Sequence, residues 1–592
     1  MKIPFFSKEE ESYRTVSRLY ELVDQCAVLY RDRPVFVYHD GIDTVTVTYG
    51  EFKRQLDRTA EGMKKLGLAG KRVAVIGETS VDWILTYLAT VANGGVIVPL
   101  DKELSHDEIL KFIVKAKVSA VAYSAHFSEL FHTRAEEIPD VTNFFALRGQ
   151  AEEGENGKYM TFRALTEIGE AELCDHSFNG YNTDPEEMCA ILFTSGTTGS
   201  SKGVMLSQKN ICFVLNGIVH ALDVRQDDVL MSVLPIHHTY ELTCGILGPM
   251  MFGASVCISD GLRYVAKNIK EFRPTLMTLV PLFVNQLHKN IWKNAEKQGA
   301  ANTLHYAMKI SKGLRFARVD LRKRLFSQVR DGLGGRLRLI IVGGAALNPE
   351  MVKEFTEFGV ATCQGYGITE CAPLISVVPT NKYNPDSCGL PICGLDVRIE
   401  KENEWDSYGE ICVKGDNVML GYYDDPEQTA EVITPDGWFH TGDYGYQDEK
   451  GYLYITGRKK NVIVLSGGKN VFPEEIEEYL EPISLISEAV VVGKLADDGE
   501  TVLVTALVYP NAEEAEKRGL HSQEELWSAI HEEINRVNRS LPNFKKIQRI
   551  EIRTKPFNKT TSMKIKRQGL AQDNTDSSET VSSSEKTEED KQ

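Results

Sequence analysis

The chain carries few of the features that mark metal-binding, disulfide-stabilised or secreted proteins. Its eleven cysteines form no Cys-x-x-Cys pair and no Cys/His cluster at zinc-site spacing. Cys189, Cys257 and Cys412 lie inside apolar strand patterns, which predicts buried free thiols in a reducing cytoplasm. The first residues lack the apolar core of a secretory signal peptide, so we expect a cytoplasmic protein without one.

Uninterrupted apolar runs of membrane-spanning length are also missing. Two long uncharged stretches, 83–100 and 242–259, are each broken by glycine or proline. We interpret each stretch as a buried helix that runs into a buried strand, and we expect no transmembrane helix.

Basic residues are outnumbered by acidic ones. The chain has 67 basic and 84 acidic residues, and a net charge of −17 over 592 residues argues against a nucleic-acid partner. The run 545–567 is an exception, with nine basic residues and one glutamate, and either a solvated face or a polyanion site explains it. Residues 568–592 hold seven acidic and two basic side chains without periodicity, which predicts an acidic, serine-rich disordered tail.

Short apolar runs alternate with amphipathic helical stretches along most of the chain. Up to about residue 388 this alternation predicts an α/β fold of largely parallel sheets. Short turn-rich strands follow, and the pattern turns to α+β after Arg458. We therefore predict an N-terminal domain over 1–457 that ends in a small β-rich subdomain, and a small α+β C-terminal domain over 458–567.

The strongest local signal follows the apolar run Ala190–Phe193. Glycines, hydroxyl groups and one lysine are gathered at Thr194, Ser195, Gly196, Thr197, Thr198, Gly199 and Lys202. Such a loop turns backbone N–H groups and hydroxyls toward a polyphosphate, and the lysine adds a point charge. The segment is not a Walker loop, because Ser201 precedes Lys202 and Gly203 follows it. A helical pattern begins at Ser207.

Two further segments follow apolar runs and suit a nucleotide. One contains Gln364, Gly365, Tyr366, Gly367, Thr369 and Glu370. Its tyrosine offers a flat face for a base, its threonine a donor for a phosphate oxygen, and its glutamate a carboxylate for Mg²⁺. The other, Gly343, Gly344 and Ala345, leaves nearly bare backbone for a planar ligand, although a plain strand-to-helix turn explains it equally well.

The remaining candidate segments are individually ambiguous. Asp443 follows Gly442 in a predicted turn, where it can accept from both hydroxyls of a ribose or simply stabilise the turn. Arg458 opens a basic stretch, a second glycine-rich loop covers 465–470, and a lysine-rich segment covers 556–567. Taken alone, each of these last three is typical of a charged surface loop.

In this order the segments resemble the adenylate-forming superfamily, which includes acyl-CoA synthetases, luciferases and the adenylation domains of peptide synthetases. The resemblance covers about residues 10–567. The segments LPIHHTYE (234–241), GYGITECAP and NKTTSMKIKR look most like long-chain fatty-acyl-CoA synthetases. The resemblance implies that ATP converts a fatty acid into acyl-AMP with release of pyrophosphate, after which the thiol of coenzyme A displaces AMP.

The resemblance also implies a role for each segment. Thr194–Lys202 would grip the β and γ phosphates, and Glu370 would help bind Mg²⁺. Gly343–Ala345 and Gln364–Gly367 would surround adenine. Thr369 would meet the α-phosphate region, and Asp443 with Arg458 the ribose. Lys564 stands where the family has its catalytic lysine, whose fixed ammonium stabilises charge that builds up on the phosphorus oxygens.

The C-terminal domain is a mobile lid in this family. The resemblance places its hinge at Lys460. One rotation would present Lys564 to ATP, and the other would present the CoA-side loop formed by Ser466, Gly467, Gly468 and Lys469.

The acid and the acceptor are less well specified. The resemblance places His238 near the acyl pocket, and we interpret it as an orienting residue, with a packed core histidine as the alternative. We expect small-molecule partners, namely the fatty acid, ATP and coenzyme A, and no nucleic acid. A carrier-protein acceptor, an aryl acid, a peripheral membrane contact and the oligomeric state stay open.

Overall fold

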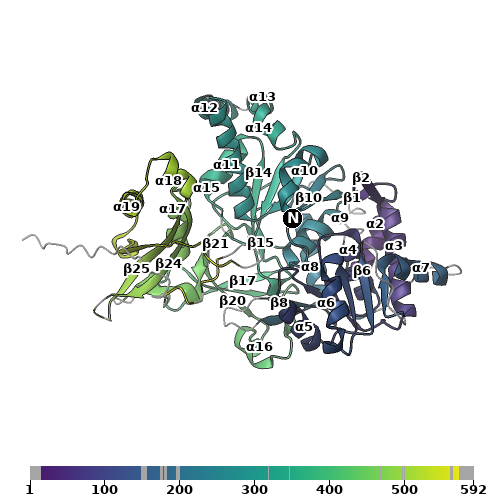
Figure 1. Ribbon diagram of the computed structural model, residues 1–592. Helices are drawn as coiled ribbons and strands as arrows, with labels where there is room; N and C mark the ends of the chain where they lie inside the picture. Colours follow the sequence, from purple (N-terminus) through teal and green to yellow (C-terminus); the bar gives the residue numbers. More distant parts are fainter. Residues whose placement is uncertain are drawn as a thin grey trace, which may run out of the picture. The chain divides into compact units, whose positions relative to one another are not determined.

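The computed structural model describes residues 15–148, 157–173, 178, 180, 183–194, 201–317, 319–345, 347–465, 469–496, 498, 500–559, 565–567 and 569–571. Two compact units emerge (Figure 1). The first comprises 1–397, 413–439 and 448–453, and the second comprises 398–412, 440–447 and 454–592. The strand segments 398–412 and 440–447, which the sequence analysis placed in the N-terminal domain, therefore group with the C-terminal unit. The expected acidic tail lies almost wholly outside the described residues.

Two sheets form the centre of the first unit. The nine-stranded sheet has the order β16 (Leu390–Pro391), β15 (Ser376–Val377), β14 (Ala361–Tyr366), β13 (Leu339–Val342), β12 (Leu276–Leu279), β10 (Val229–Ser232), β11 (Ser255–Ile258), β1 (Pro34–Asp40) and β2 (Asp43–Thr48). The eight-stranded sheet has the order β19 (Gly421–Tyr422), β9 (Lys202–Ser207), β8 (Met188–Thr194), β4 (Val96–Leu100), β3 (Arg72–Ile76), β5 (Ala120–Ser124), β6 (Asn143–Leu147) and β7 (Tyr159–Thr161). The central pairs of both sheets are parallel, which confirms the predicted α/β class.

Helices pack on both sheets, as the crossovers between parallel strands require. The α-helices are α2 (Leu19–Leu29), α3 (Tyr49–Lys65), α4 (Val81–Ala92), α5 (His106–Lys115), α6 (Ser128–Thr133), α7 (Phe162–Glu172), α8 (Gln208–Ala221), α9 (Gly248–Met250), α10 (Val265–Phe272), α11 (Pro281–Lys297), α12 (Ala301–Phe316), α13 (Arg322–Leu325), α14 (Ser327–Gly332), α15 (Pro349–Glu357) and α16 (Pro426–Val432). A π-helix, η4 (Tyr240–Leu247), and the 3₁₀ turns η1 (Ala125–Phe127), η2 (Ala135–Glu137), η5 (Leu262–Tyr264) and η6 (Thr369–Cys371) complete the unit.

Local sequence explains several of these boundaries. The Thr48 hydroxyl caps α3 by accepting from the backbone N–H of Glu51, and the Glu51 carboxylate accepts from the Thr48 backbone N–H in return, which forms a capping box. Both uncharged stretches of the sequence are a buried helical segment followed by a buried strand, as predicted. Among the helices that the described residues form, none combines the length and the apolarity needed to cross a bilayer.

Three features of this unit escaped the sequence analysis. The β1–β2 hairpin lies at a sheet edge, and the alternation in β2 of residues such as Thr44 and Thr46 with valines leaves only a weak apolar signal. Strand β9 lies between the glycine-rich loop and α8 and pairs antiparallel with β8. Helices α11–α14 fill the interval between β12 and β13, where no element was assigned.

The second unit holds the larger part of a four-stranded sheet of order β17 (Asp396–Glu400), β18 (Gly409–Lys414), β20 (Phe439–Gln447) and β21 (Leu453–Arg458). The chain continues through η7 (Lys459–Asn461), β22 (Ile463–Val464), β23 (Asn470–Val471), α17 (Pro473–Leu480), β24 (Ile486–Leu495), β25 (Val502–Pro510), α18 (Ala512–Lys517), α19 (Gln523–Ser540), η8 (Asn543–Lys545) and β26 (Arg549–Ile552). Strands β24–β26 form one sheet, and its apolar face packs with α17 and α19 around Ile476, Val504 and Ile530. The predicted α+β pattern of this region is confirmed.

Candidate nucleotide site

The candidate phosphate loop is the tip of the β8–β9 hairpin. Thr194 and Lys202 face each other as the last described pair of this hairpin, and the Thr194 hydroxyl donates to the Lys202 carbonyl at 3.5 Å. Ser195, Gly196, Thr197, Thr198 and Gly199 lie outside the described residues. The described residues on either side of this stretch are held by one antiparallel ladder.

Lys202 and Glu370 are brought together by a residue that the sequence analysis missed, Tyr422. The Tyr422 hydroxyl donates to Glu370 Oε1 at 3.0 Å, and Lys202 Nζ lies 4.5 Å from the centre of the Tyr422 ring. The backbone of Tyr422 also pairs with β9 opposite Val204. Burial, together with the Glu370 carboxylate, raises the pKa of Tyr422 well above its usual value, so the phenol keeps its proton and remains a donor.

This arrangement suits a magnesium–phosphate ligand. Thr369 and Glu370 lie half-buried on η6, and Tyr422 fixes the orientation of the carboxylate. Mg²⁺ takes oxygen ligands and commonly uses one or two carboxylates together with substrate phosphates. Gly367 enters the same turn, where an added Cβ would lie 1.8 Å from the Pro373 carbonyl oxygen, so only glycine fits.

The Gly343–Ala345 run has an internal reason for its small residues. A Cβ on Gly343 would lie 2.9 Å from the ring of Tyr240, and Gly344 has a φ of +90°. Ala345 is exposed. Gln364 braces this loop, since its Oε1 accepts from the Leu347 backbone and its Nε2 donates to the Pro385 carbonyl, both at 3.0 Å. Gly365 and the buried Tyr366 follow on the same strand, β14.

The predicted acyl-side histidine lies in a polar cluster around the start of η4. The rings of His237 and His238 are 4.1 Å apart, and His237 Nε2 is 3.4 Å from Asp101 Oδ2 at the end of β4. Next to them Glu241 is fully buried; it accepts hydrogen bonds from Ser232 and, at 3.1 Å, from Thr278. Burial raises the pKa of Glu241 to about 7 despite these hydroxyls. The sequence analysis missed Glu241. The signal that could have found it is a glutamate directly before the long uncharged stretch 242–259.

In the second unit Asp443 and Arg458 meet directly. Asp443 lies on strand β20 and not in the predicted turn, because β20 pairs on both sides and continues to Gln447. The Arg458 Nε lies 2.8 Å from Asp443 Oδ1, and the aspartate side chain is almost fully buried. Two strands of one sheet thus hold the predicted ribose pair in place.

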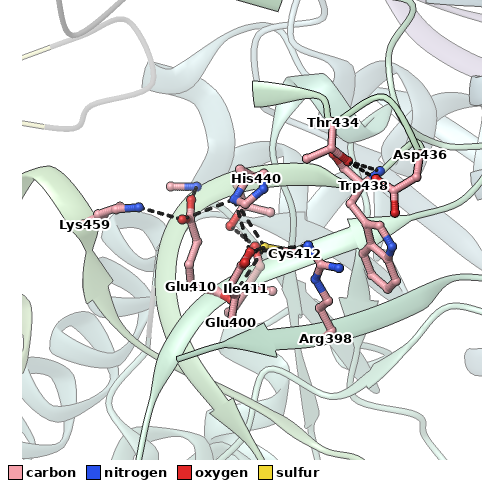
Figure 2. A network of polar contacts seen from close by, with 12 residues as sticks. Arg398, Glu400, Glu410, Ile411, Cys412, Thr434, Asp436, Trp438, His440 and Lys459 are labelled. Carbon is pink, nitrogen blue, oxygen red and sulfur yellow. Dashed lines mark hydrogen bonds and ion pairs between the residues drawn. The ribbon is translucent and has the colours of Figure 1, made fainter. Parts of the chain in front are cut away.

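The same sheet holds a second carboxylate close to the predicted hinge. Glu410 contacts Lys459 at 2.7 Å and His440 at 3.3 Å (Figure 2). Burial alone would raise the pKa of Glu410, but Lys459 and His440 outweigh burial and hold the pKa below its usual value. Lys460 follows Lys459 on η7 and is exposed.

The remaining predicted residues of this unit are only partly described. Lys469 lies with its ammonium 4.8 Å from the Phe544 ring, whereas Ser466, Gly467, Gly468 and Lys564 lie outside the described residues. In the sequence, Lys564 lies between two described residues that pair with each other. Lys559 pairs with Ile565 in an antiparallel bridge, and Lys559 Nζ lies 2.6 Å from Glu488 on β24.

Comparison with known families settles the relationship that these motifs suggest. The profile of the AMP-binding enzyme family matches residues 23–423, and that of the AMP-binding enzyme C-terminal domain matches residues 460–581. The chain belongs to the AMP-binding enzyme family.

Curated relatives of this AMP-binding enzyme are distant but span nearly the whole chain. A long-chain-fatty-acid–CoA ligase from Mycobacterium bovis is 27% identical over 92% of this chain and 94% of its own length. A long-chain-fatty-acid–CoA ligase from Rattus norvegicus is also 27% identical, over 83% of this chain and 77% of its own. Both relatives are thus similar to this chain over most of their own length.

Solved structures agree with this fold. ATP-bound MatB from Rhodopseudomonas palustris superposes with a TM-score of 0.71 at 25% identity, over 93% of this chain and 98% of that one. An anthranilate CoA ligase in complex with anthranoyl-AMP gives a TM-score of 0.74 at 19% identity, over 93% and 96%. The second likeness concerns the fold alone, and the anthranilate in that title differs from the fatty acids named for the curated relatives.

Proposed function

We propose that this enzyme activates a long-chain fatty acid with ATP and transfers the acyl group to coenzyme A. The observation that carries the proposal is the cluster of Lys202, Tyr422 and Glu370. It holds a cation and a carboxylate together, and Lys202 directly follows the hydroxyl-rich stretch 194–201 in the sequence. The fatty-acid names of the distant relatives support the choice of acid.

In the first step a carboxylate oxygen of the acid attacks the α-phosphorus of ATP. The bond between the α-phosphorus and its bridging oxygen breaks, and pyrophosphate leaves. Lys202 and the hairpin loop neutralise the β and γ phosphates, and Thr369 donates to the α-phosphate. Glu370 would hold Mg²⁺, which neutralises phosphate charge when it is bound. Asp443 accepts from the ribose hydroxyls and Arg458 fixes its orientation, while Lys564 stabilises the charge that grows on the α-phosphate oxygens.

In the second step the sulfur of coenzyme A attacks the acyl carbonyl carbon. The thiol proton passes to solvent, the carbon–oxygen bond to AMP breaks, and AMP leaves. We infer that η7 at Lys460 is the hinge between the two steps and that Ser466, Gly467, Gly468 and Lys469 form the coenzyme A side of the lid. His238 orients the acyl carboxylate and need not act as a base, since that carboxylate is already ionised at neutral pH.

The direct test measures AMP release from ATP, with and without coenzyme A, across saturated acids from acetate to stearate. We expect release that depends on coenzyme A and peaks at the long-chain acids. If pyrophosphate exchanges into ATP but no thioester product forms, the acceptor is a carrier protein and not coenzyme A. Activity with aryl acids alone would overturn the fatty-acid assignment.

A single variant separates the two steps. Lys564→Ala should slow acyl-AMP formation by roughly 10²–10³, the scale for loss of one preorganised charge. It should largely spare thioester formation from synthetic acyl-AMP, since that step has no pentavalent phosphorus to stabilise. Equal loss in both steps would contradict the assigned roles.

We also infer a peripheral contact with anionic lipid, made by α12. Tyr306, Ile310 and Phe316 are 67%, 53% and 95% exposed, and the exposed Lys309 and Lys312 lie between them. Exposed apolar side chains interleaved with lysines fit a negatively charged bilayer surface, and they stand out on a chain of net charge −17.

In a sedimentation assay, Ile310→Ser with Phe316→Ser should lose binding to anionic vesicles. Trp405→Ser, which changes another exposed side chain, should not.

A further inference from the structure

Three metal-ligating side chains from different strands meet in the second unit. They are Glu400 on β17, Cys412 on β18 and His440 on β20 (Figure 2). Cys412 Sγ lies 3.4 Å from Glu400 Oε2 and 3.5 Å from His440 Nδ1, and the remaining pair, Nδ1 and Oε2, is 3.7 Å apart.

These separations are those of ligands around a tetrahedral cation. A metal that binds its ligands at about 2.0–2.3 Å in a tetrahedron separates them by roughly 3.3–3.8 Å, since each edge is about 1.6 bond lengths. We propose that Glu400, Cys412 and His440 form a binding site for a zinc-type divalent cation, with water as the fourth ligand. Sequence spacing does not reveal this site, because the three ligands lie far apart along the chain and converge only through strand pairing.

The donor set selects the class of cation. One sulfur, one imidazole nitrogen and one carboxylate oxygen suit Zn²⁺, whereas Mg²⁺ and Ca²⁺ take oxygen ligands. Cys412 is fully buried, while the side chains of Glu400 and His440 are 49% and 24% exposed. One side of the cluster is therefore open to an entering ion and to the water ligand.

Metal binding releases a proton from the site. Burial, followed by the Glu400 carboxylate, raises the pKa of the Cys412 thiol to about 12, so the thiol is protonated before the ion arrives. On binding, the S–H bond breaks, the sulfur–metal bond forms and the proton passes to solvent. Nδ1 of His440 must present its lone pair, so the neutral ring carries its proton on Nε2.

The charged groups around the cluster balance each other. Arg398 lies 3.4 Å from Glu400 Oε2 and partly neutralises it. On the other side Glu410 lies 3.3 Å from His440 Nδ1 and 2.7 Å from Lys459, so Glu410 keeps a cationic partner when His440 turns to the metal. The cluster thus shares strand β20 with Asp443 and would stiffen the sheet that holds the ribose pair.

The test is a titration of the purified, chelator-treated full chain with Co²⁺, a spectroscopic substitute for Zn²⁺. We expect one equivalent to give a thiolate-to-cobalt charge-transfer band together with the intense visible bands of a tetrahedral site. Cys412→Ser should abolish the charge-transfer band. His440→Gln removes one proposed ligand and should weaken binding by roughly tenfold or more, since loss of a group that only hydrogen-bonds to a ligand already costs about tenfold. Cys393→Ser, which removes an exposed cysteine, should bind as the parent chain does.

Calorimetry with Zn²⁺ in two buffers of different ionisation enthalpy gives a second readout. About one proton should be released per ion bound by the parent chain, and this release should disappear in Cys412→Ser. Absence of the charge-transfer band in the parent chain would overturn the proposal. So would its persistence in Cys412→Ser or its loss in Cys393→Ser. Circular dichroism of each variant separates loss of the site from loss of the fold.

Discussion

Two buried carboxylates, one in each unit, show how partners reverse the effect of burial. Glu241, at the start of η4, is surrounded by the neutral hydroxyls of Ser232 and Thr278, and its pKa is raised to about 7. Glu410, on β18, is nearly as buried but faces Lys459 and His440, and its pKa is lowered. Hydroxyl donors offset only part of the desolvation of a carboxylate, whereas cations reverse it.

The difference in pKa follows the structural role of each carboxylate. Glu241 ties the π-helix to two neighbouring strands, since Ser232 ends β10 and Thr278 lies on β12. Its uncharged form therefore stabilises an apolar core beside the histidine pair. Glu410 is part of a charged sheet that leads into η7, where an ion pair tolerates water and rearrangement. Hydrogen bonds in a buried core thus make the region around Glu241 rigid, whereas the ion pairs around Glu410 allow that region to rearrange.

The largest effect is expected from removal of the buried carboxyl group. Glu241→Ala leaves a cavity and two hydroxyls without their acceptor, which should lower the free energy of unfolding of the first unit by roughly 3–4 kcal/mol. Chemical denaturation followed by tryptophan fluorescence measures this loss. Glu241→Gln is the matched control, because it fills the space and should retain most of the stability. An alanine variant as stable as the parent chain would show that the carboxyl group does not anchor η4.

The sequence predicts some of the candidate residues and misses others. The glycine-rich loop, Thr369 and Glu370 are predicted because their residue types and order carry the chemistry locally, and their roles stay predictions. Tyr422, Glu241 and the Glu400–Cys412–His440 cluster were not found, since each acts through pairing between strands that are distant in sequence. Asp443 was assigned to a turn because its glycine neighbours are typical of turns, whereas ladders on both sides extend the strand through it.

An intermediate effect is expected in the pH dependence of stability. The folded chain binds the Glu241 proton with a pKa of about 7, above the ordinary value of 4.5, so the folded state holds more protons in that window. This stabilisation is complete below pH 4.5 and is lost as the pH rises through about 7, by roughly 3 kcal/mol. Glu241→Gln should remove this decline, which denaturation curves at several pH values would reveal. An identical decline in the variant would assign it to another group.

The smallest loss of stability is expected for Glu410, in the charged region. Glu410→Gln keeps an acceptor for the Gly442 N–H, which donates to Glu410 Oε1 at 3.1 Å, but removes the charge that Lys459 faces. Because the Lys459 side chain is 53% exposed, water replaces much of the lost attraction, and the expected loss is about 1 kcal/mol. The lowered pKa of Glu410 means that its contribution is present at neutral pH and is lost as the pH falls through the folded-state pKa, opposite in sign to Glu241. A double-mutant cycle with Lys459→Met measures the coupling. A coupling as large as the loss in Glu241→Ala would mean that the second region is as rigidly built as the first, and the contrast between the two carboxylates would then lie in their pKa values alone.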